Sequence, residues 1–419
     1  MTRRILFTGM FDMQNYGDLL FPLVTRHALA AHGLVPVPVA PTAGRTALAD
    51  AMPPVALTEV LAGEHLTAGI AIGGGYIIHA QPLTFIEDYD TQGTGTWAGP
   101  GLWLGATLAA ALADIPVAWN APGAPHPFTT RQRPLVEAAC RAASYLAVRD
   151  RGSAELLAPP ADAPAAIVPD PIAGIAAMWP RAALDADFHA LLARKSLPVD
   201  ARLLAIHVRN RSMAGLAPET LGPALAALAA AHQATPMLVA VGHSHDDPGV
   251  ARRLAPHMGA DLLLLDDPRS LREITAALAY SAAYVGASLH GYVVASAYGI
   301  PAVLLGRPAY RKFAGFLEHA GRMEDLARDW PGAIALAAAR LAQPRHAGMP
   351  PALLAALDAH WAALAQAFAD PAPHRQARQD FLRALVVHGL ARDGPGWAML
   401  PFLSRAVRHA APPGAPENG

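Results

Sequence analysis

The stretch GASLHGYVVASAYGIPAVLL, residues 286–305, contains the most informative change of pattern in the chain. An apolar run ends at Gly286, small residues follow at helical spacing, and GIP at 299–301 leads into a second apolar run. Strand, helix and strand in this order predict a parallel sheet covered by helices. Ser288 and His290 lie where the first strand gives way to the helix, the usual place of functional groups in such sheets. We therefore predict that His290 is a functional residue.

The same alternation extends over most of the chain and predicts an α/β protein. We expect strands at 5–8, 69–72, 117–119, 145–148, 203–208, 237–241, 261–265, 283–285 and 302–305. We expect helices at 19–31, 102–112, 129–142, 218–232, 270–280 and 292–298, the fifth begun by a capping box of Ser270 and Glu273. Residues 158–200, rich in Pro and Ala, predict a linker between two α/β halves. After about residue 322 the pattern is helical only.

Composition excludes several classes of protein. The chain has 419 residues, of which 53% are hydrophobic and 16% are charged, so it is not a disordered chain. A formal net charge of −1 argues against a nucleic-acid partner. The longest apolar run is interrupted by Asp114 and Pro116, which argues against a transmembrane helix. A single cysteine, Cys140, forbids an intramolecular disulfide, and we expect a cytoplasmic protein.

Two glycine-containing segments follow predicted strands in the first half. NYGD places Asn15, Gly17 and Asp18 at the start of a helix, where free backbone N–H groups bind anions, although a plain turn with a helix cap explains the pattern equally well. IGGGYII at 72–78 contains three consecutive glycines, which permit close approach of a ligand or simply form a loop; they are Gly73, Gly74 and Gly75. The run lacks the full dinucleotide fingerprint.

Cationic side chains end two further strands. Arg149 and Asp150 precede a helix, where a surface ion pair is the alternative to a binding role. His207 and Arg209 share one face of a predicted buried strand, and a buried arginine needs an anionic partner, such as a ligand carboxylate or phosphate.

GHSHDD at 242–247 offers His243, His245, Asp246 and Asp247 as conceivable metal ligands. A polar loop leading into a helix explains them better, because no second ligand cluster accompanies them. We predict no metal site.

Together these segments resemble the polysaccharide pyruvyl transferase family. The resemblance covers roughly residues 4–320 and rests on the order of its motifs: NYGD, a strand ending in GGG, VRD, PDP at 169–171, a strand with Arg209, and SLHG followed by AYGIP. RKFAGFLEHAG at 311–321 is similar to a segment of the exopolysaccharide branch.

The resemblance implies a fold similar to GT-B glycosyltransferases, with Rossmann-like halves at 1–175 and 200–320 and a helical segment at 325–410. It implies transfer of the enolpyruvyl group of phosphoenolpyruvate onto two sugar hydroxyls, forming a pyruvate ketal without another cofactor. His290 matches the catalytic histidine, and Arg209 matches the arginine that holds the donor. Many members have an arginine where this chain has Ser288, so Lys312 and Arg149 are candidates to replace it.

Two other classes remain open. A GT-B glycosyltransferase that uses a nucleotide sugar would share the fold, and a non-catalytic glycan-binding module would not need His290 and Arg209 together. The acceptor glycan, free, lipid-linked or attached to a nucleotide, is not specified by the sequence. The sequence also does not specify a homo-oligomeric state, a position at the inner face of the membrane, or a sugar contact of the 81–101 loop with Trp97 and the nearby Trp103.

Overall fold

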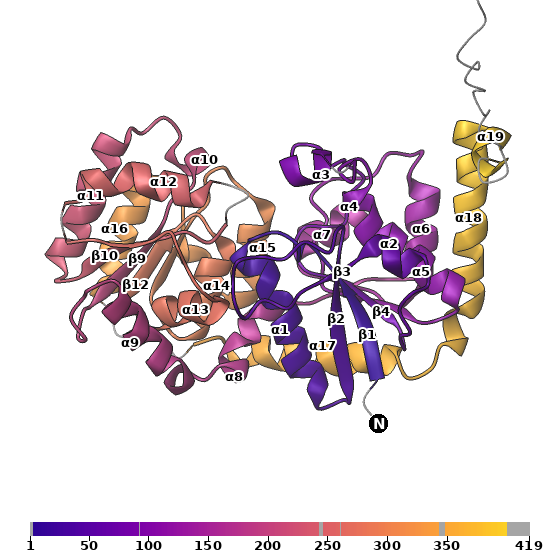
Figure 1. The fold of residues 1–419 in the computed structure, drawn as a ribbon, viewed down its shortest axis with the longest axis horizontal. Coiled ribbons are helices and arrows are strands. Elements are labelled where there is room, and N and C mark those ends of the chain that lie inside the picture. The colour runs from indigo at the N-terminus through magenta and orange to yellow at the C-terminus, as the bar shows by residue number, and fades with distance from the viewer. Residues whose placement is uncertain (1–2, 92, 243–245, 260, 343–347, 400–419) are drawn as a thin grey trace, which may run out of the picture.

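A computed structural model describes residues 3–91, 93–242, 246–259, 261–342 and 348–399. It forms two α/β halves, each built on a six-stranded parallel sheet (Figure 1). The first sheet has the order β3-β2-β1-β4-β5-β6, formed by Val55–Ala56, Leu34–Ala40, Arg3–Thr8, Ile70–Gly73, Val117–Asn120 and Ala143–Tyr145. The second has the order β11-β10-β9-β12-β13-β14, formed by Leu263–Leu265, Thr235–Val239, Leu203–His207, Ala283–Gly286, Ala302–Leu305 and Leu326–Ala327.

The two sheets repeat the same Rossmann-like order, so the predicted fold class of paired α/β halves is confirmed. The strand order reverses between β1 and β4 in the first sheet and between β9 and β12 in the second. At such a reversal the following loops diverge, which leaves a crevice at the carboxyl ends of the strands.

Helices cover both faces of each sheet, because strands buried on two sides need apolar partners above and below. The first half contains α1 (Tyr16–Ala30), α2 (Leu57–Leu61), α3 (Glu87–Thr91), α4 (Ala98–Pro100), a π-helical turn (Gly101–Gly105), α5 (Ala106–Ala113), α6 (Arg133–Ala142) and α7 (Arg151–Leu157). The second contains α10 (Asn210–Met213), α11 (Pro218–Ala231), α12 (Asp247–Leu254), α13 (Leu271–Tyr280), α14 (Leu289–Ala297), α15 (Arg311–Ala320) and α16 (Trp330–Leu341).

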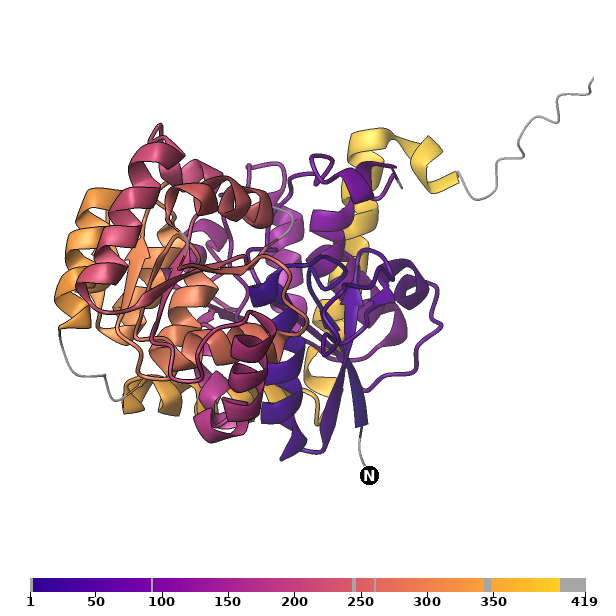
Figure 2. The same ribbon diagram turned by 60° about the vertical axis from the view of Figure 1, so that its left-hand side comes forward.

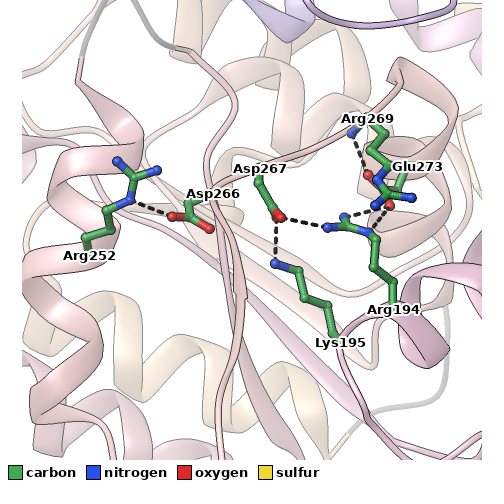
Figure 3. Close-up of polar contacts among 7 residues, drawn as sticks. All are labelled: Arg194, Lys195, Arg252, Asp266, Asp267, Arg269 and Glu273. Atoms are coloured by element: carbon green, nitrogen blue, oxygen red, sulfur yellow. Dashed lines mark hydrogen bonds and ion pairs between the residues drawn. The ribbon is translucent and has the colours of Figure 1, made fainter.

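The segment between the halves carries short helices rather than an extended linker. These include a 3₁₀ turn (Pro171–Gly174), α8 (Ile175–Met178), a further 3₁₀ turn (Arg181–Leu184) and α9 (Asp185–Arg194), which packs on α13. Figure 3 shows ion pairs that fasten the end of α9 to the second half: Arg194 Nη1 and Lys195 Nζ lie 2.8 and 2.6 Å from Asp267, and Arg194 also contacts Glu273.

Two predictions about the strands are wrong. The expected strand at 145–148 is divided into β6 and β7 (Ala147–Val148), and β7 leaves the main sheet to pair with β8 (Ala166–Ile167). The chain after residue 322 is not purely helical, because β14 extends the second sheet.

The C-terminal helices cross from the second half back to the first, as Figures 1 and 2 show. α16 packs on β12 and β13, whereas α17 (Pro351–Ala367) contacts β5 and β6. α18 (Arg375–Asp393) packs on α5 and α6 and is followed by α19 (Pro395–Met399). No single helix in the described part of the chain is long and apolar enough to cross a bilayer. The α17 and α18 segments, which meet at an angle of 79°, reach the required length and composition only when they are taken together.

Candidate functional site

The predicted site residues gather where the strand order of both sheets reverses. Asn15 to Asp18 follow β1, Gly74 and Gly75 follow β4, Arg209 follows β9, and His290 follows β12. The halves meet directly at this point, since the Tyr16 amide donates to the Val241 carbonyl at 2.7 Å. The topology therefore accounts for the convergence of residues almost 300 positions apart in the sequence.

His290 is positioned by the first turn of α14 and by α1 of the other half. Ser288 caps α14, because its hydroxyl accepts a hydrogen bond from the Gly291 amide at 3.3 Å. The His290 ring lies against Gly17, where a Cβ atom would come within 1.5 Å of Nδ1. Phe21 meets the ring edge to face at 5.6 Å. The glycine of NYGD thus makes room for the histidine of SLHG.

Asp170 is the carboxylate partner of His290. Its Oδ2 atom lies 3.5 Å from His290 Nε2 and 3.7 Å from Arg149 Nη1, while Oδ1 accepts a hydrogen bond from the Ile172 amide. Burial alone would raise the pKa of Asp170, but the neighbouring His290 and Arg149 lower it below its ordinary value. The ionised Asp170 carboxylate can therefore orient the His290 ring from the side of Nε2.

Arg149 and Lys312 meet at the ring of Tyr76. The Arg149 guanidinium lies 4.1 Å from the centre of that ring, and Lys312 Nζ lies 5.5 Å from it. Arg149 is 5% exposed, and its Nε lies 3.5 Å from Asp150 Oδ2. Burial, together with the charges of Arg149 and Arg209, lowers the pKa of Lys312 to about 7. We call Arg149, Arg209 and Lys312 the cation cluster.

Arg209 has the anionic partner that a buried arginine requires, and in the structure that partner is a protein carboxylate. Its Nε lies 3.5 Å from Asp247 Oδ1, and Asp247 Oδ2 lies 2.9 Å from His207 Nε2. Burial lowers the pKa of His207, although Asp247 opposes that shift. Because 19% of the Arg209 side chain is exposed, it still has surface available to a ligand.

The 242–247 segment gives no evidence of a metal centre. His243 and His245 lie outside the described residues, and Asp246 pairs with Arg253 at the surface. No group of three or more potential metal ligands occurs among the residues that the structure describes.

The glycine run and Ser288 have structural tasks of their own. A Cβ on Gly73 would contact Asn120 and Phe7, and one on Gly74, at φ +92°, would meet Phe21 and Phe11. These glycines therefore permit packing against protein side chains, whereas Gly75 faces Asp18 Oδ1, which would lie 2.9 Å from an added Cβ. Ser288 is 4% exposed and serves as the helix cap.

Two adjoining pockets lie in the first half, and the smaller of them is lined by Asp18 and Tyr76. The smaller, of about 170 Å³, is lined mainly by apolar side chains together with Asn15, Asp18 and Tyr76. The larger, of about 650 Å³, is polar and includes Asp12, Arg45, Glu87 and Asp88. Both are lined by Met13, Phe85 and Ile86, so the two pockets adjoin.

Two site residues, Asp170 and Tyr76, received no role from the sequence. Asp170 belongs to the PDP motif. An aspartate directly before a proline is typical of a residue that caps the start of a helical turn, and this pattern could have predicted its role as the cap of the Pro171–Gly174 turn. Tyr76 immediately follows the glycine run, but nothing local indicates that two cations from distant segments contact its ring.

The arrangement can bind an anion and transfer a proton beside it. Several buried polar atoms of the cation cluster and of the His290–Asp170 pair make no hydrogen bond among the described residues, although all but Arg149 Nη2 face an ion-pair partner at 3.5 Å; they are Arg149 Nε and Nη2, Arg209 Nε, Asp170 Oδ2 and His290 Nε2. Buried polar atoms are normally hydrogen-bonded, so such a concentration indicates a site completed by a ligand.

Comparison with known proteins relates this geometry to a family. A family model for polysaccharide pyruvyl transferases matches residues 15–308, and a search of curated proteins gives no match. Similar solved structures include Staphylococcus aureus MnaA with UDP, with 11% identity, coverage of 94% of this chain and 98% of that one, and a TM-score of 0.52. Another is the UDP-N-acetylglucosamine 2-epimerase of Rickettsia bellii, with 11% identity, coverage of 94% and 99%, and a TM-score of 0.51. These likenesses show the fold alone, and they confirm the expected similarity to GT-B enzymes.

Proposed function

Since this chain belongs to the polysaccharide pyruvyl transferase family, we propose that it moves the pyruvyl carbons of phosphoenolpyruvate onto two hydroxyls of one sugar, forming a cyclic ketal. The observation that carries the proposal is the convergence of the cation cluster with the His290–Asp170 pair. Phosphoenolpyruvate is small, carries a carboxylate and a phosphate, and reacts by protonation, so it needs these two features side by side.

The cation cluster would hold the two anionic groups of the donor. A guanidinium can grip a carboxylate or phosphate through two parallel hydrogen bonds. Among the residues that the structure describes, neither Nε nor Nη2 of Arg149 has a hydrogen-bond acceptor, although Nε lies 3.5 Å from Asp150 Oδ2. Lys312, whose pKa is lowered to about 7, is readily recharged by a dianion placed next to it. The cluster would also stabilise the phosphate as it leaves.

His290 would protonate the methylene carbon of the donor. Asp170 would fix the orientation of the imidazole, while Gly17 and Phe21 limit the space in which the ring can turn. Protonation makes the adjacent carbon electrophilic, and a sugar hydroxyl attacks it. Phosphate then leaves, the second hydroxyl closes the ring, and a neutral His290 can accept that hydroxyl's proton.

The acceptor glycan would lie in the two adjoining pockets. Phe85 lines both pockets and is 79% exposed, so its aromatic ring could stack on a sugar ring. Trp103, in contrast, is fully buried and donates its indole N–H to the His79 carbonyl, so it belongs to the core. The loop that carries Phe85 is anchored by Tyr89, whose hydroxyl donates to Asp12 Oδ1 at 2.5 Å.

The decisive experiment measures phosphate released from phosphoenolpyruvate with a panel of glycan acceptors, free, lipid-linked and nucleotide-linked. The expected result is acceptor-dependent phosphate release together with the singlet methyl resonance of a pyruvate ketal in the product. A parallel arm offers UDP-sugars as donors. Turnover of a UDP-sugar without turnover of phosphoenolpyruvate would replace this proposal with the glycosyltransferase alternative.

A further inference from the structure

Asp18 lines the smaller pocket and lies within electrostatic reach of His290. It is the third residue of α1, immediately after Gly17, against which the His290 ring rests. Its Oδ1 atom faces Gly75, and its side chain lines the pocket together with Asn15 and Tyr76. Among the described residues lining that pocket, Asp18 alone carries a carboxylate. A ligand in the pocket would therefore meet this carboxylate, which adjoins in the chain the glycine that His290 contacts.

The proposed reaction requires two proton-transfer groups. In the first step the methylene carbon gains a proton while the attacking hydroxyl loses one, and a single group cannot donate and accept at the same moment. In the second step the closing hydroxyl loses a proton while the departing phosphate gains one. His290 provides one member of each exchange, so each step needs a partner.

Resting on this pyruvyl-transfer reaction, we propose that Asp18 is the catalytic base for the first sugar hydroxyl and then the acid for the leaving phosphate. Initially His290 is protonated and Asp18 is ionised. His290 gives its proton to carbon, the first hydroxyl oxygen bonds to the adjacent carbon, and Asp18 takes the hydroxyl proton. The carbon–oxygen bond to phosphate then breaks and Asp18 protonates the departing oxygen. The second hydroxyl closes the ring and returns a proton to His290, so both groups regain their initial states.

The surroundings of Asp18 suit a carboxyl group that acts first as a base and then as an acid. Burial raises the pKa of its carboxyl, whereas His290 of α14, Lys312 of α15 and Arg149 oppose the shift and Asp170 reinforces it. A carboxylate with a raised pKa is a stronger base when ionised, and general acid–base groups work best when their pKa lies near the operating pH. The opposing cations keep the ionised form accessible.

The test uses Asp18→Asn in the full chain, with phosphoenolpyruvate and the acceptor that the panel identifies. We expect kcat to fall by about 10²–10⁴-fold, the usual contribution of such a group. Calorimetric binding of phosphoenolpyruvate should stay equal or become tighter, because a negative charge beside the cation cluster has been removed. The matched control is Asp185→Asn, which removes a carboxylate from the first turn of α9 outside the site and should retain wild-type turnover.

The pH profile gives a second readout. Asp18 must be ionised to act as the base, so wild-type kcat should rise with pH through the raised pKa of Asp18, and Asp18→Asn should lose this acidic limb. Retained turnover in Asp18→Asn, or weakened phosphoenolpyruvate binding by it, would overturn the inference while leaving pyruvyl transfer intact. Failure of the wild-type chain to turn over phosphoenolpyruvate would instead overturn the proposed function, and this inference with it.

Discussion

The ring of His290 occupies the space that a side chain at position 17 would need. The two residues belong to different halves of the protein. Gly17, in the first turn of α1, therefore sets the position of a histidine that follows β12 of the other sheet. Asp170 then fixes the ring from the side of Nε2. The histidine is therefore oriented by contacts that no local sequence pattern contains.

Gly17→Ala should displace His290. The added Cβ would lie 1.5 Å from Nδ1, a separation that real atoms do not adopt, so the ring must move away from Asp170. A shift of about 1 Å at a reacting group can cost roughly 100-fold in rate, and we expect kcat to fall by at least that factor. Stability should also fall, by about 1–3 kcal/mol, the usual cost of overpacking, partly offset by the helix propensity of alanine.

Steady-state kinetics and thermal unfolding of Gly17→Ala separate these effects. The matched control is Gly396→Ala, the second residue of α19, where an added Cβ meets nothing within 4 Å. Wild-type kcat in Gly17→Ala would show that the position of His290 does not govern the reaction.

At the scale of elements, α13 begins with a cap supplied by the opposite half. Asp50 accepts hydrogen bonds from the Leu271 amide at 2.6 Å and the Arg272 amide at 2.9 Å, while Ser270 accepts from the Glu273 amide. The predicted cap by Ser270 is confirmed, but the Glu273 carboxylate accepts from the Arg269 amide, as Figure 3 shows. Three free N–H groups of the first turn are thus satisfied, two of them across the junction between the halves.

Asp50→Ala should destabilise the chain by about 0.5–2 kcal/mol, the usual effect of losing a helix cap. The physical reason is that the Leu271 and Arg272 amides lose their hydrogen-bond acceptor. The N-terminus of α13 also loses the favourable interaction of its helix dipole with a negative charge. Calorimetric unfolding measures the change. Asp162→Ala, which removes a carboxylate 63% exposed from a surface ion pair with Arg141, is the control and should have little effect. Equal midpoints for the two variants would contradict the role given to Asp50.

Elements are predictable from sequence where their own periodicity determines them. β9, β12 and β13 are continuous apolar runs, and the sequence locates them within two residues. β2 escapes prediction because Pro36 and Pro38 interrupt its pattern. The structure accepts them because β3 pairs with β2 only at Val39 and Ala40, which leaves the outer edge at both prolines unpaired.

The site shows the same division between local and tertiary information. Strand ends alone indicate His290 and Arg209, because functional groups follow strands in this class of fold. Other contacts of the site arise only when separate segments come together. They are the pairing of Asp170 with His290, the pairing of Asp247 with Arg209, and the contact of two cations with Tyr76. The sequence carries the residues but not these partnerships.

At the scale of the whole molecule, the cation cluster spans both halves. Arg149 belongs to the first half, Arg209 follows β9 of the second, and Lys312 of α15 lies within electrostatic reach of both. The halves also share a buried hydrogen bond between the Tyr16 and Thr275 hydroxyls at 2.8 Å. A donor held by this cluster would therefore contact both halves at once.

Phosphoenolpyruvate should consequently raise the midpoint of thermal unfolding, and substitutions in either half should abolish that rise. A ligand at 100 times its Kd stabilises the folded state by about 2.7 kcal/mol. Removing one member of a buried charged contact costs about 2–5 kcal/mol, so both Arg149→Gln and Arg209→Gln should lose most of the shift. Each variant is compared with its own ligand-free midpoint, which separates donor binding from intrinsic stability.

Arg252→Gln is the matched control for this loss of charge. Arg252 lies in the second half, is 61% exposed and pairs with Asp266 away from the cluster (Figure 3). Its variant should keep the full shift, because its charge is screened by solvent and makes no contact with the cluster. A shift that disappears in Arg209→Gln but survives in Arg149→Gln, or the reverse, would place the donor within one half. That result would contradict a site formed jointly by the carboxyl ends of both sheets.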